Sequence, residues 1–422
     1  MTASEQLAQF AAGSKALPKL CREYKKERAT VHLKELVGGA LSFYAAAAVA
    51  KTGGVHIFVA EDRDAAAYLL NDFYNLLDEK QVYFFPSSYK RSAAYGAEDA
   101  QGVVQRTTAM NAVRGFTKGY LVVCTYPEAL AERVVDAATL QRDTIAVKLG
   151  DKISIAVLED ALADANFTRV DFVYEPGQYS VRGGIVDVFS YSESKPYRID
   201  FFGDEVDSIR RFNISSQLSA DKLDRVEIVP NLNAGEAPRV SFVQFAGSGA
   251  TCWFYDADYV LRRVNDLRRK VLADMEDPGR IDRLLPSRNV LLRDMAGNSV
   301  VALRDNLPER PATAAVVFDT APQPKFNKNF EMLADDMIRN SLRGYATYIL
   351  SENKVQVERL ENIFHQIGRG QAAVRSLSVT LHEGFVDNDL KLCLYTDHQI
   401  FDRYQRYRIN GEIRRDEQMT VA

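Results

Sequence analysis

The feature that most constrains the fold is a strand-rich stretch from Phe172 to Phe212, FVYEPGQYSVRGGIVDVFSYSESKPYRIDFFGDEVDSIRRF. Turns divide it at Pro176-Gly177, Gly183-Gly184 and Gly203-Asp204. Between these turns apolar and polar residues alternate with the period of two that is typical of a strand with one buried face. We therefore predict an antiparallel sheet here.

Residues 197–202 show the alternation most clearly. One set of side chains is apolar and is predicted to face the core: Tyr197, Ile199 and Phe201. The other set is predicted to face outward: Arg198, Asp200 and Phe202. A large aromatic residue displayed beside a charged pair is typical of a binding hot spot. The alternative is that both faces are covered and that Phe202 belongs to a core.

On either side of this stretch, strands alternate with helices, which predicts a parallel sheet covered on both faces. A chain of 422 residues is too long for one hydrophobic core. We predict a multidomain α/β protein in which an α+β module interrupts one α/β body. The predicted parts are a first lobe (1–144), the inserted module (145–231), the rest of the body (232–322), a small α/β domain (323–409) and a linker (410–422).

Composition narrows the class of protein. A formal net charge of −4 excludes a global basic field that would attract nucleic acid. The cysteines Cys21, Cys124, Cys252 and Cys393 are scattered, so we expect reduced thiols rather than disulfides or a zinc site. No apolar run approaches the roughly 20 residues needed to span a bilayer, and no signal peptide is evident. We expect a cytoplasmic protein with no membrane partner.

A glycine pair at Gly38-Gly39 stands where a phosphate-binding loop would stand, between a strand and a helix. The segment Leu36–Phe43 contains Ser42 but lacks the lysine and the second spaced glycine of a working loop. We therefore predict a degenerate phosphate loop (Gly38, Gly39, Ser42) that does not support nucleotide hydrolysis. No nucleophile–base pair is evident, so we predict neither catalytic nor metal-binding residues.

Several polar residues are predicted to start helices. Thr125, Ser351 and Thr396 each precede a helical pattern, and the last two would open helices at Lys354–Gln366 and His398–Arg406. Asp256 or Asp258 is predicted to cap an arginine-rich helix rather than to bind a metal. That helix leaves open a direct DNA-binding role for its basic residues Arg262, Arg263, Arg268, Arg269 and Lys270.

Two segments resemble one known family. Residues 175–189 (EPGQYSVRGGIVDVF) and 196–210 (PYRIDFFGDEVDSIR) are similar to signatures of the bacterial transcription-repair coupling factor family (Mfd), and UvrB shares a looser version. The resemblance implies a degenerate helicase-like, P-loop-type body, an inserted module and a small degenerate α/β domain. UvrB itself keeps the loop lysine and a tyrosine-rich hairpin, for which residues 84–96 leave little room.

The resemblance also implies a function. The chain would be a non-catalytic N-terminal part that recruits UvrA, of nucleotide excision repair, to stalled RNA polymerase. The positions that match the UvrA-contacting motif are Arg182, Arg198 and Phe202, with Glu205 and Asp207 as further candidates on the same sheet. For Arg182 the alternative is a structural arginine that binds carbonyl groups at the Gly183-Gly184 bend.

By the same resemblance, the chain would be a fragment of a longer protein. ATP, Mg²⁺, RNA polymerase and double-stranded DNA would bind only domains beyond it, and we expect no cofactor in this chain. The competing hypothesis is a nucleotide-dependent, helicase-like DNA-damage protein of the UvrB type.

Overall fold

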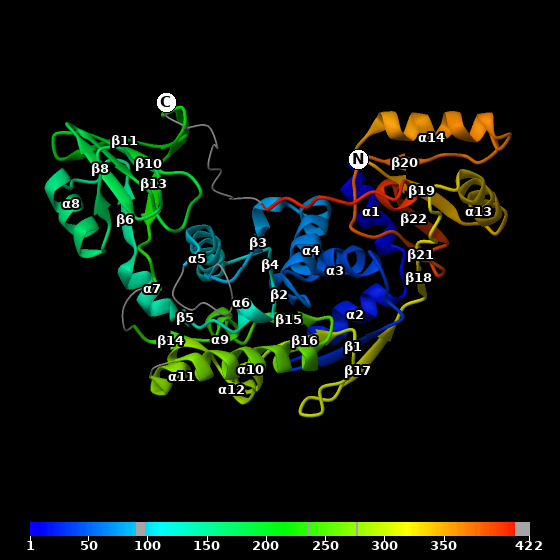
Figure 1. Cartoon of the computed structure of the whole chain (residues 1–422), viewed down its shortest axis with the longest axis horizontal. Coiled ribbons are helices and arrows are strands. Elements are labelled where there is room, and N and C mark those ends of the chain that lie inside the picture. The colour runs from blue at the N-terminus through cyan, green and yellow to red at the C-terminus, as the bar shows by residue number, and fades with distance from the viewer. Residues whose placement is uncertain (90–97, 234–236, 276, 410–422) are drawn as a thin grey trace.

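The computed structural model describes residues 1–89, 98–233, 237–275 and 277–409. Along the longest axis of the molecule, the inserted module lies at one end, the α/β body in the middle and the C-terminal sheet at the other end (Figure 1). The predicted linker 410–422 lies outside the described residues. The absence of a long hairpin within residues 84–96 stays a prediction, because 90–97 are also outside them.

The body is built on a seven-stranded sheet with the order β17-β1-β16-β15-β2-β4-β3, in which all neighbours are parallel. Its strands are β1 (Thr30–Lys34), β2 (Gly54–Val59), β3 (Val82–Phe84), β4 (Tyr120–Thr125), β15 (Thr251–Phe254), β16 (Ser299–Ala302) and β17 (Ala314–Val317). Strands β15–β17 follow the module in sequence but lie between or beside β1 and β2. The predicted parallel sheet and the predicted insertion are thus both confirmed.

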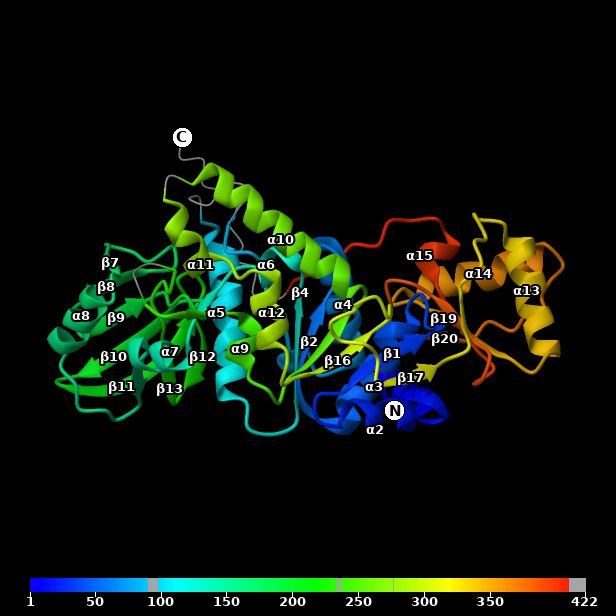
Figure 2. The same ribbon diagram turned by 90° about the horizontal axis from the view of Figure 1, so that it is seen from below.

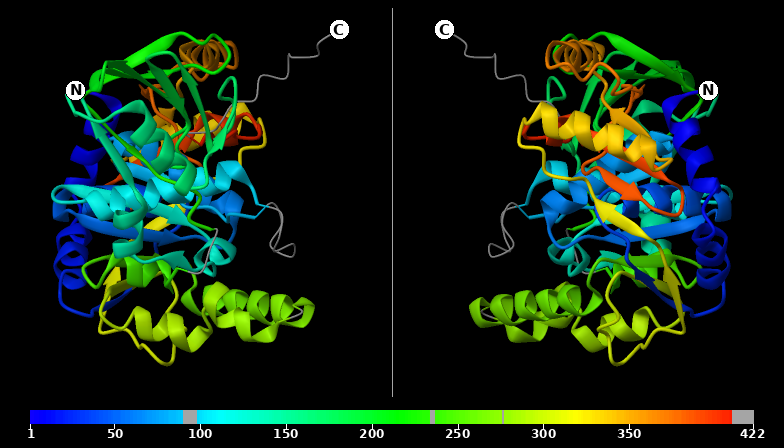
Figure 3. Two further views of the ribbon diagram at one scale, coloured as in Figure 1. Left: turned by 90° about the vertical axis from the view of Figure 1, so that its left-hand side faces the viewer. Right: turned by 90° about the vertical axis from the view of Figure 1, so that its right-hand side faces the viewer.

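Helices cover both faces of this sheet, with α3 and α4 on one face and α10 and α12 on the other (Figures 1 and 3). The helices before the module are α1 (Ala3–Ala12), α2 (Ala16–Tyr24), α3 (Ala40–Thr52), α4 (Arg63–Leu76), α5 (Ala100–Gly115), α6 (Pro127–Leu130) and α7 (Ala137–Asp143). Those after it are α9 (Phe242–Ala246), α10 (Ala257–Asp274), α11 (Ile281–Leu284) and α12 (Arg288–Asp294).

The module has its own six-stranded sheet, β12-β11-β10-β9-β8-β7, which is antiparallel except for the β7–β8 pair. Its elements are β6 (Ile145–Lys148), α8 (Ile155–Asp164), β7 (Thr168–Arg169), β8 (Gln178–Arg182), β9 (Ile185–Val188), β10 (Tyr197–Phe202), β11 (Glu205–Phe212), β12 (Ser219–Leu223) and β13 (Arg225–Ile228). A separate hydrophobic core fills it. Where the chain leaves and re-enters the body, β5 (Val134–Val135) pairs with β14 (Arg239–Val240).

The C-terminal part carries a mixed five-stranded sheet, β18-β21-β22-β19-β20. Its elements are β18 (Thr320–Pro322), α13 (Phe330–Leu342), β19 (Ala346–Leu350), α14 (Lys354–Gln366), β20 (Ser376–Leu377), β21 (Phe385–Asp387), β22 (Leu392–Thr396) and α15 (Asp397–Ile400). One face has its own core. Other residues of this part, such as Leu381 and Phe385, belong to the core of the body, where the rings of Phe385 and Phe43 lie 5.3 Å apart.

Two further contacts fix this arrangement. The segment after α15 runs back over α4, where the Arg408 amide donates to Asn71 at 2.9 Å (Figure 2). Tyr44 of α3 donates its hydroxyl to the Asp387 carboxylate. The body and the C-terminal sheet are therefore joined by packing as well as by the chain.

The predicted helix starts were partly wrong. Asp256 does cap α10, accepting from the Tyr259 amide at 2.8 Å. Tyr126, not Thr125, precedes α6, because the Thr125 hydroxyl donates to the Phe85 carbonyl instead.

In the C-terminal part, α14 has its predicted range, but Asn353 caps it rather than Ser351. Helix α15 ends at Ile400, well short of the predicted Arg406. Among the described residues, no helix is long and apolar enough to cross a membrane.

Candidate protein-binding face of the inserted module

The outer face of the module sheet carries two mostly polar rows that run across the strands. One row lies on β8 to β12 and contains Ser180, Asp187, Arg198, Arg210 and Lys222. The neighbouring row contains Arg182, Ile185, Asp200 and Ser208. On the opposite face the corresponding row is apolar and packs into the core: Val181, Val186, Ile199, Ile209 and Leu223.

Asp187 is the centre of the outer face. Its carboxylate is 1% exposed and accepts hydrogen bonds from both predicted arginines. Arg198 binds it in a bidentate way, with Nε–Oδ1 at 2.7 Å and Nη2–Oδ2 at 2.8 Å. Arg182 donates from Nη2 to Oδ2 at 2.6 Å. A planar guanidinium held by two parallel bonds has little rotational freedom, so Asp187 fixes the position of Arg198.

The guanidinium of Arg198 lies 4.5 Å from the centre of the Phe212 ring and donates to the Gln217 carbonyl at 3.3 Å. The hydrogen bond with Asp187 is the main reason why its pKa is raised. Only 15% of the side chain is exposed. The Arg198 side chain is thus largely buried within the face.

Arg182 is more accessible, at 37% exposure. Its Nη1 donates to the Asp171 carbonyl at 3.0 Å, and its guanidinium lies 4.8 Å from the ring centre of Phe172. The alternative predicted that Arg182 binds carbonyl groups of the Gly183-Gly184 bend, but the carbonyl group that it binds belongs to Asp171. Arg182 links the sheet to the segment that precedes β8.

Phe202 lies at the end of β10 and is 84% exposed, which confirms its predicted outward position. Glu205 is its cross-strand partner at the start of β11, and Asp207 stands exposed where the β10–β11 register shifts. The five candidate residues thus share one sheet, but only Arg182 and Arg198 are brought into contact through a common partner.

Sequence reasoning missed Asp187 and three exposed apolar side chains of the module. These are Phe172, Tyr174 and Leu218. Phe172 stacks on Arg182, and Leu218 follows the residue whose carbonyl binds Arg198. A carboxylate inside the apolar run Ile185–Val188 was the available signal for Asp187, because a buried charge needs a partner.

The degenerate phosphate loop is covered by the C-terminal part. Gly38 has a φ of +58°. A Cβ placed on Gly39 would lie 2.0 Å from the Glu383 carbonyl oxygen. The Ser42 hydroxyl donates to Asp72 Oδ2 at 2.6 Å. The chain's own backbone therefore stands against the loop where a phosphate-binding loop needs open space.

Asp72 connects this loop to the C-terminal sheet. The His382 amide donates to its Oδ1 at 2.6 Å, and the ring of His382 stacks on Tyr68 at 3.7 Å. Burial raises the pKa of Asp72 to about 7, although the hydrogen bonds from Ser42 and His382 oppose that shift. The interface between the body and the C-terminal part thus contains a carboxyl group that titrates near neutral pH.

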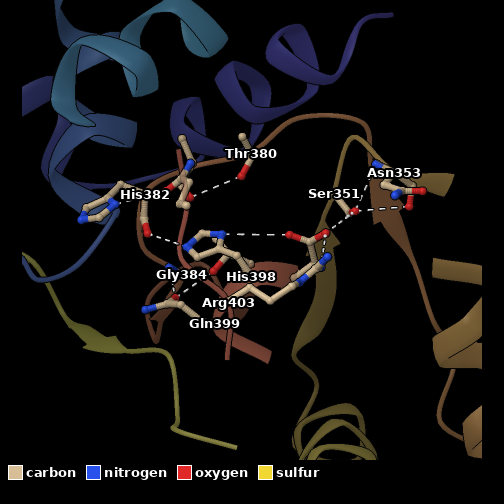
Figure 4. A network of polar contacts seen from close by, with 12 residues as sticks. Ser351, Asn353, Thr380, His382, Gly384, His398, Gln399 and Arg403 are labelled. Carbon is tan, nitrogen blue, oxygen red and sulfur yellow. Dashed lines mark hydrogen bonds and ion pairs between the residues drawn. The ribbon is translucent and has the colours of Figure 1, made fainter. Parts of the chain in front are cut away.

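The network continues from His382 into the C-terminal sheet (Figure 4). His398 Nε2 lies 2.8 Å from the His382 carbonyl, and its Nδ1 lies 4.0 Å from Asp397. The Ser351 hydroxyl donates to Asp397 at 2.7 Å. Because the histidine is bonded to a carbonyl rather than to the serine, this cluster is not arranged to activate a nucleophile.

Asp72→Asn is expected to remove a pH dependence of stability. In the unfolded chain the pKa of an aspartate is about 3.9. The native state therefore holds a proton that the unfolded state has released, and the contribution of Asp72 to the unfolding free energy falls between about pH 4 and 7. Asparagine can keep both hydrogen bonds, because its oxygen accepts from His382 and its nitrogen donates to Ser42.

The unfolding free energy of this variant, relative to that of the unchanged chain, should rise by roughly 2 kcal/mol between about pH 5 and pH 8. Urea titrations at both pH values measure the difference. Asp164→Asn, at an exposed position of α8, is the control and should show no such rise. If the difference in unfolding free energy between Asp72→Asn and the unchanged chain does not vary with pH, the raised pKa of Asp72 is contradicted.

The basic helix α10 does not present free arginines. Arg262 pairs with Asp258 at 2.8 Å, Arg263 with Glu128 at 2.6 Å, and Arg268 with Asp282 at 2.5 Å. Arg269 pairs with Asp266. A carboxylate beside each guanidinium offsets the positive potential that phosphate groups would need, which disfavours α10 as a DNA-binding surface.

Comparison with known proteins places the module in a sequence family. Residues 145–233 match the family described as UvrB interaction domain. The chain is 27% identical over 199 residues to the transcription-repair-coupling factors of Bacillus subtilis and of Escherichia coli, which is 47% of this chain and 17% of each relative. It is 35% identical over 101 residues to that of Haemophilus influenzae, which is 24% of this chain and 9% of the relative.

The matched regions therefore span less than a fifth of these relatives. The family match covers the module whose buried Asp187 organises the outer face. The chain is homologous to the N-terminal region of transcription-repair-coupling factors, including the UvrB interaction domain.

Proposed function

We propose that this chain is a non-catalytic docking platform that binds UvrA through the outer face of the inserted module. In the longer protein that its relatives represent, it would bring UvrA to stalled RNA polymerase. The observation that carries the proposal is the exposed ring of Phe202 on the sheet where Asp187 fixes two arginines. An aromatic anchor beside preoriented arginines is the composition of a protein-binding hot spot.

The degenerate loop supports the non-catalytic part of the proposal. A nucleotide would need the space next to Gly39 that the Glu383 carbonyl fills. The loop also has no lysine to neutralise phosphate charge. An ATPase assay of this chain, with and without DNA, should give no turnover above that of a protein-free blank.

Phe202→Ala is expected to weaken UvrA binding by about 2 kcal/mol or more, the usual scale of a hot-spot residue. The fold should be unchanged, because the ring is 84% exposed and leaves no cavity. Biolayer interferometry with purified UvrA measures the affinity. Leu342→Ala is the matched control, because Leu342 on α13 is also 84% exposed but lies far from the module.

Equal UvrA affinity of the two variants would remove Phe202 from the site. Arg198→Glu is a poor test, since it would place a carboxylate against buried Asp187 and disturb the sheet. Glu205→Ala and Asp207→Ala change exposed residues, so they can report on the edge of the face without that complication.

A further inference from the structure

A cavity of about 240 Å³ opens beside the degenerate phosphate loop. It lies at the carboxyl ends of parallel strands β2 and β15, the edge at which open α/β sheets bind ligands. Its wall includes the aromatic residues Phe58, Tyr68, Trp253, Phe254 and Tyr255. The cavity is thus shaped for a small ligand with an apolar body.

The charged groups of the wall are carboxylates. Glu61, Asp72 and Glu383 line the cavity, while no lysine or arginine does so among the described residues. Glu383 Oε2 lies 3.5 Å from where a Cβ on Gly38 would be, at the start of α3. A carboxylate thus occupies the place at a helix N-terminus where a phosphate would bind.

Arg304, which follows the lining residue Leu303, is already engaged. Arg304 lies over the Tyr255 ring at 5.6 Å, and its Nη1 is 3.7 Å from Asp256 Oδ2. Inside the cavity, Asp72 is buried while Glu383 is exposed at the mouth. The charge of Glu383 contributes to the raised pKa of Asp72, after the larger effect of burial. The negative charge of Glu383 therefore disfavours ionisation of Asp72 across the cavity.

We infer that this cavity binds a small organic ammonium ion, with its charge between Glu383 and Asp72 and its apolar body against Trp253 and Phe58. The cation relieves the repulsion between the two carboxylates, and the apolar body is removed from water against the aromatic side chains. Phosphate esters are excluded for the same electrostatic reason. A site that in P-loop proteins selects anions has here the opposite charge preference.

The test uses three probes that share a phenyl body and differ in charge: 2-phenylethylamine, 2-phenylethanol and phenylacetate. Trp253 is the one tryptophan of the chain and lies in the wall, so its fluorescence reports on occupancy. At about pH 8 the amine is protonated, and the pH lies above the value of about 7 to which burial raises the pKa of Asp72. The amine should bind saturably and at least about tenfold more tightly than the alcohol, and the acid should not bind.

Two variants locate the site. Glu383→Gln should lower the affinity for the amine by about tenfold and leave the alcohol unaffected, while Glu358→Gln, on the exposed side of α14, should change neither. Ala65→Leu narrows the cavity and should weaken both. No saturable response, equal affinities of the three probes, or an amine preference that survives Glu383→Gln would each overturn the inference.

Discussion

Replacing Asp187 with alanine is expected to cost the module about 3 kcal/mol of stability, the largest effect of any single change on its outer face. The change removes a buried carboxylate and leaves Arg198 without its bidentate partner in a site that is 15% exposed. Water can only partly replace the lost bonds there. Arg182 loses a bond as well, but it is exposed enough for solvent to compensate.

Hydrogen exchange measured by mass spectrometry on the whole chain separates this effect from global unfolding. Amides of β8–β10 should exchange about 100-fold faster in Asp187→Ala, while those of β1 and β2 keep their protection. Asp207→Ala is the control, because it removes an exposed carboxylate from the same sheet. Unchanged protection in Asp187→Ala would mean that the arginines hold their positions without it.

Gly39→Ala is expected to detach the C-terminal sheet from the body. The new methyl carbon would lie 2.0 Å from the Glu383 carbonyl oxygen, a backbone atom that cannot rotate away. Relief requires the segment around Glu383 to move and to break the hydrogen bond from His382 to Asp72. Overpacking of this kind costs about 3 kcal/mol.

Exchange of the amides in the segment 381–385 and the rate of limited proteolysis near residues 322–328 both report on this contact. Both should rise in Gly39→Ala. Gly115→Ala, on α5, is the control, because a Cβ there meets no atom within 4 Å. If the amides of residues 381–385 keep their protection in Gly39→Ala, the loop and Glu383 can move apart while the C-terminal sheet stays packed on the body.

Much of the fold could be predicted because its signals are local. The period of two in residues 197–202 correctly placed Phe202 outside. Only one face of this sheet packs into the core, so only one of the two alternating sets of side chains can be the buried one. The insertion was also predictable, because the α/β alternation stops and resumes. The helix starts at Thr125 and Ser351 were wrong because tertiary partners, the Phe85 carbonyl and Asp397, compete for their hydroxyls.

The candidate site was predicted only in part, because its organising contacts join residues that are distant in sequence. Asp187 and Arg198 lie on the two neighbouring strands β9 and β10, and only the strand register shows that they face each other. Glu383 lies more than three hundred residues after Gly38, and no pattern near either one indicates that they meet. The sequence motifs therefore indicated the arginines and the degenerate loop. They did not indicate that Asp187 binds the arginines or that Glu383 lies against the loop.

The shared core of the body and the C-terminal sheet determines where the chain can be divided. A cut after residue 322 would expose the ring of Phe43 and the pocket that Phe385 fills, so neither piece would be expected to stay in solution without aggregation. The module has a core of its own, and its contacts with the body include the ion pair Arg114–Glu227. It is therefore the part that could be transplanted into another protein with the least repair of exposed apolar surface.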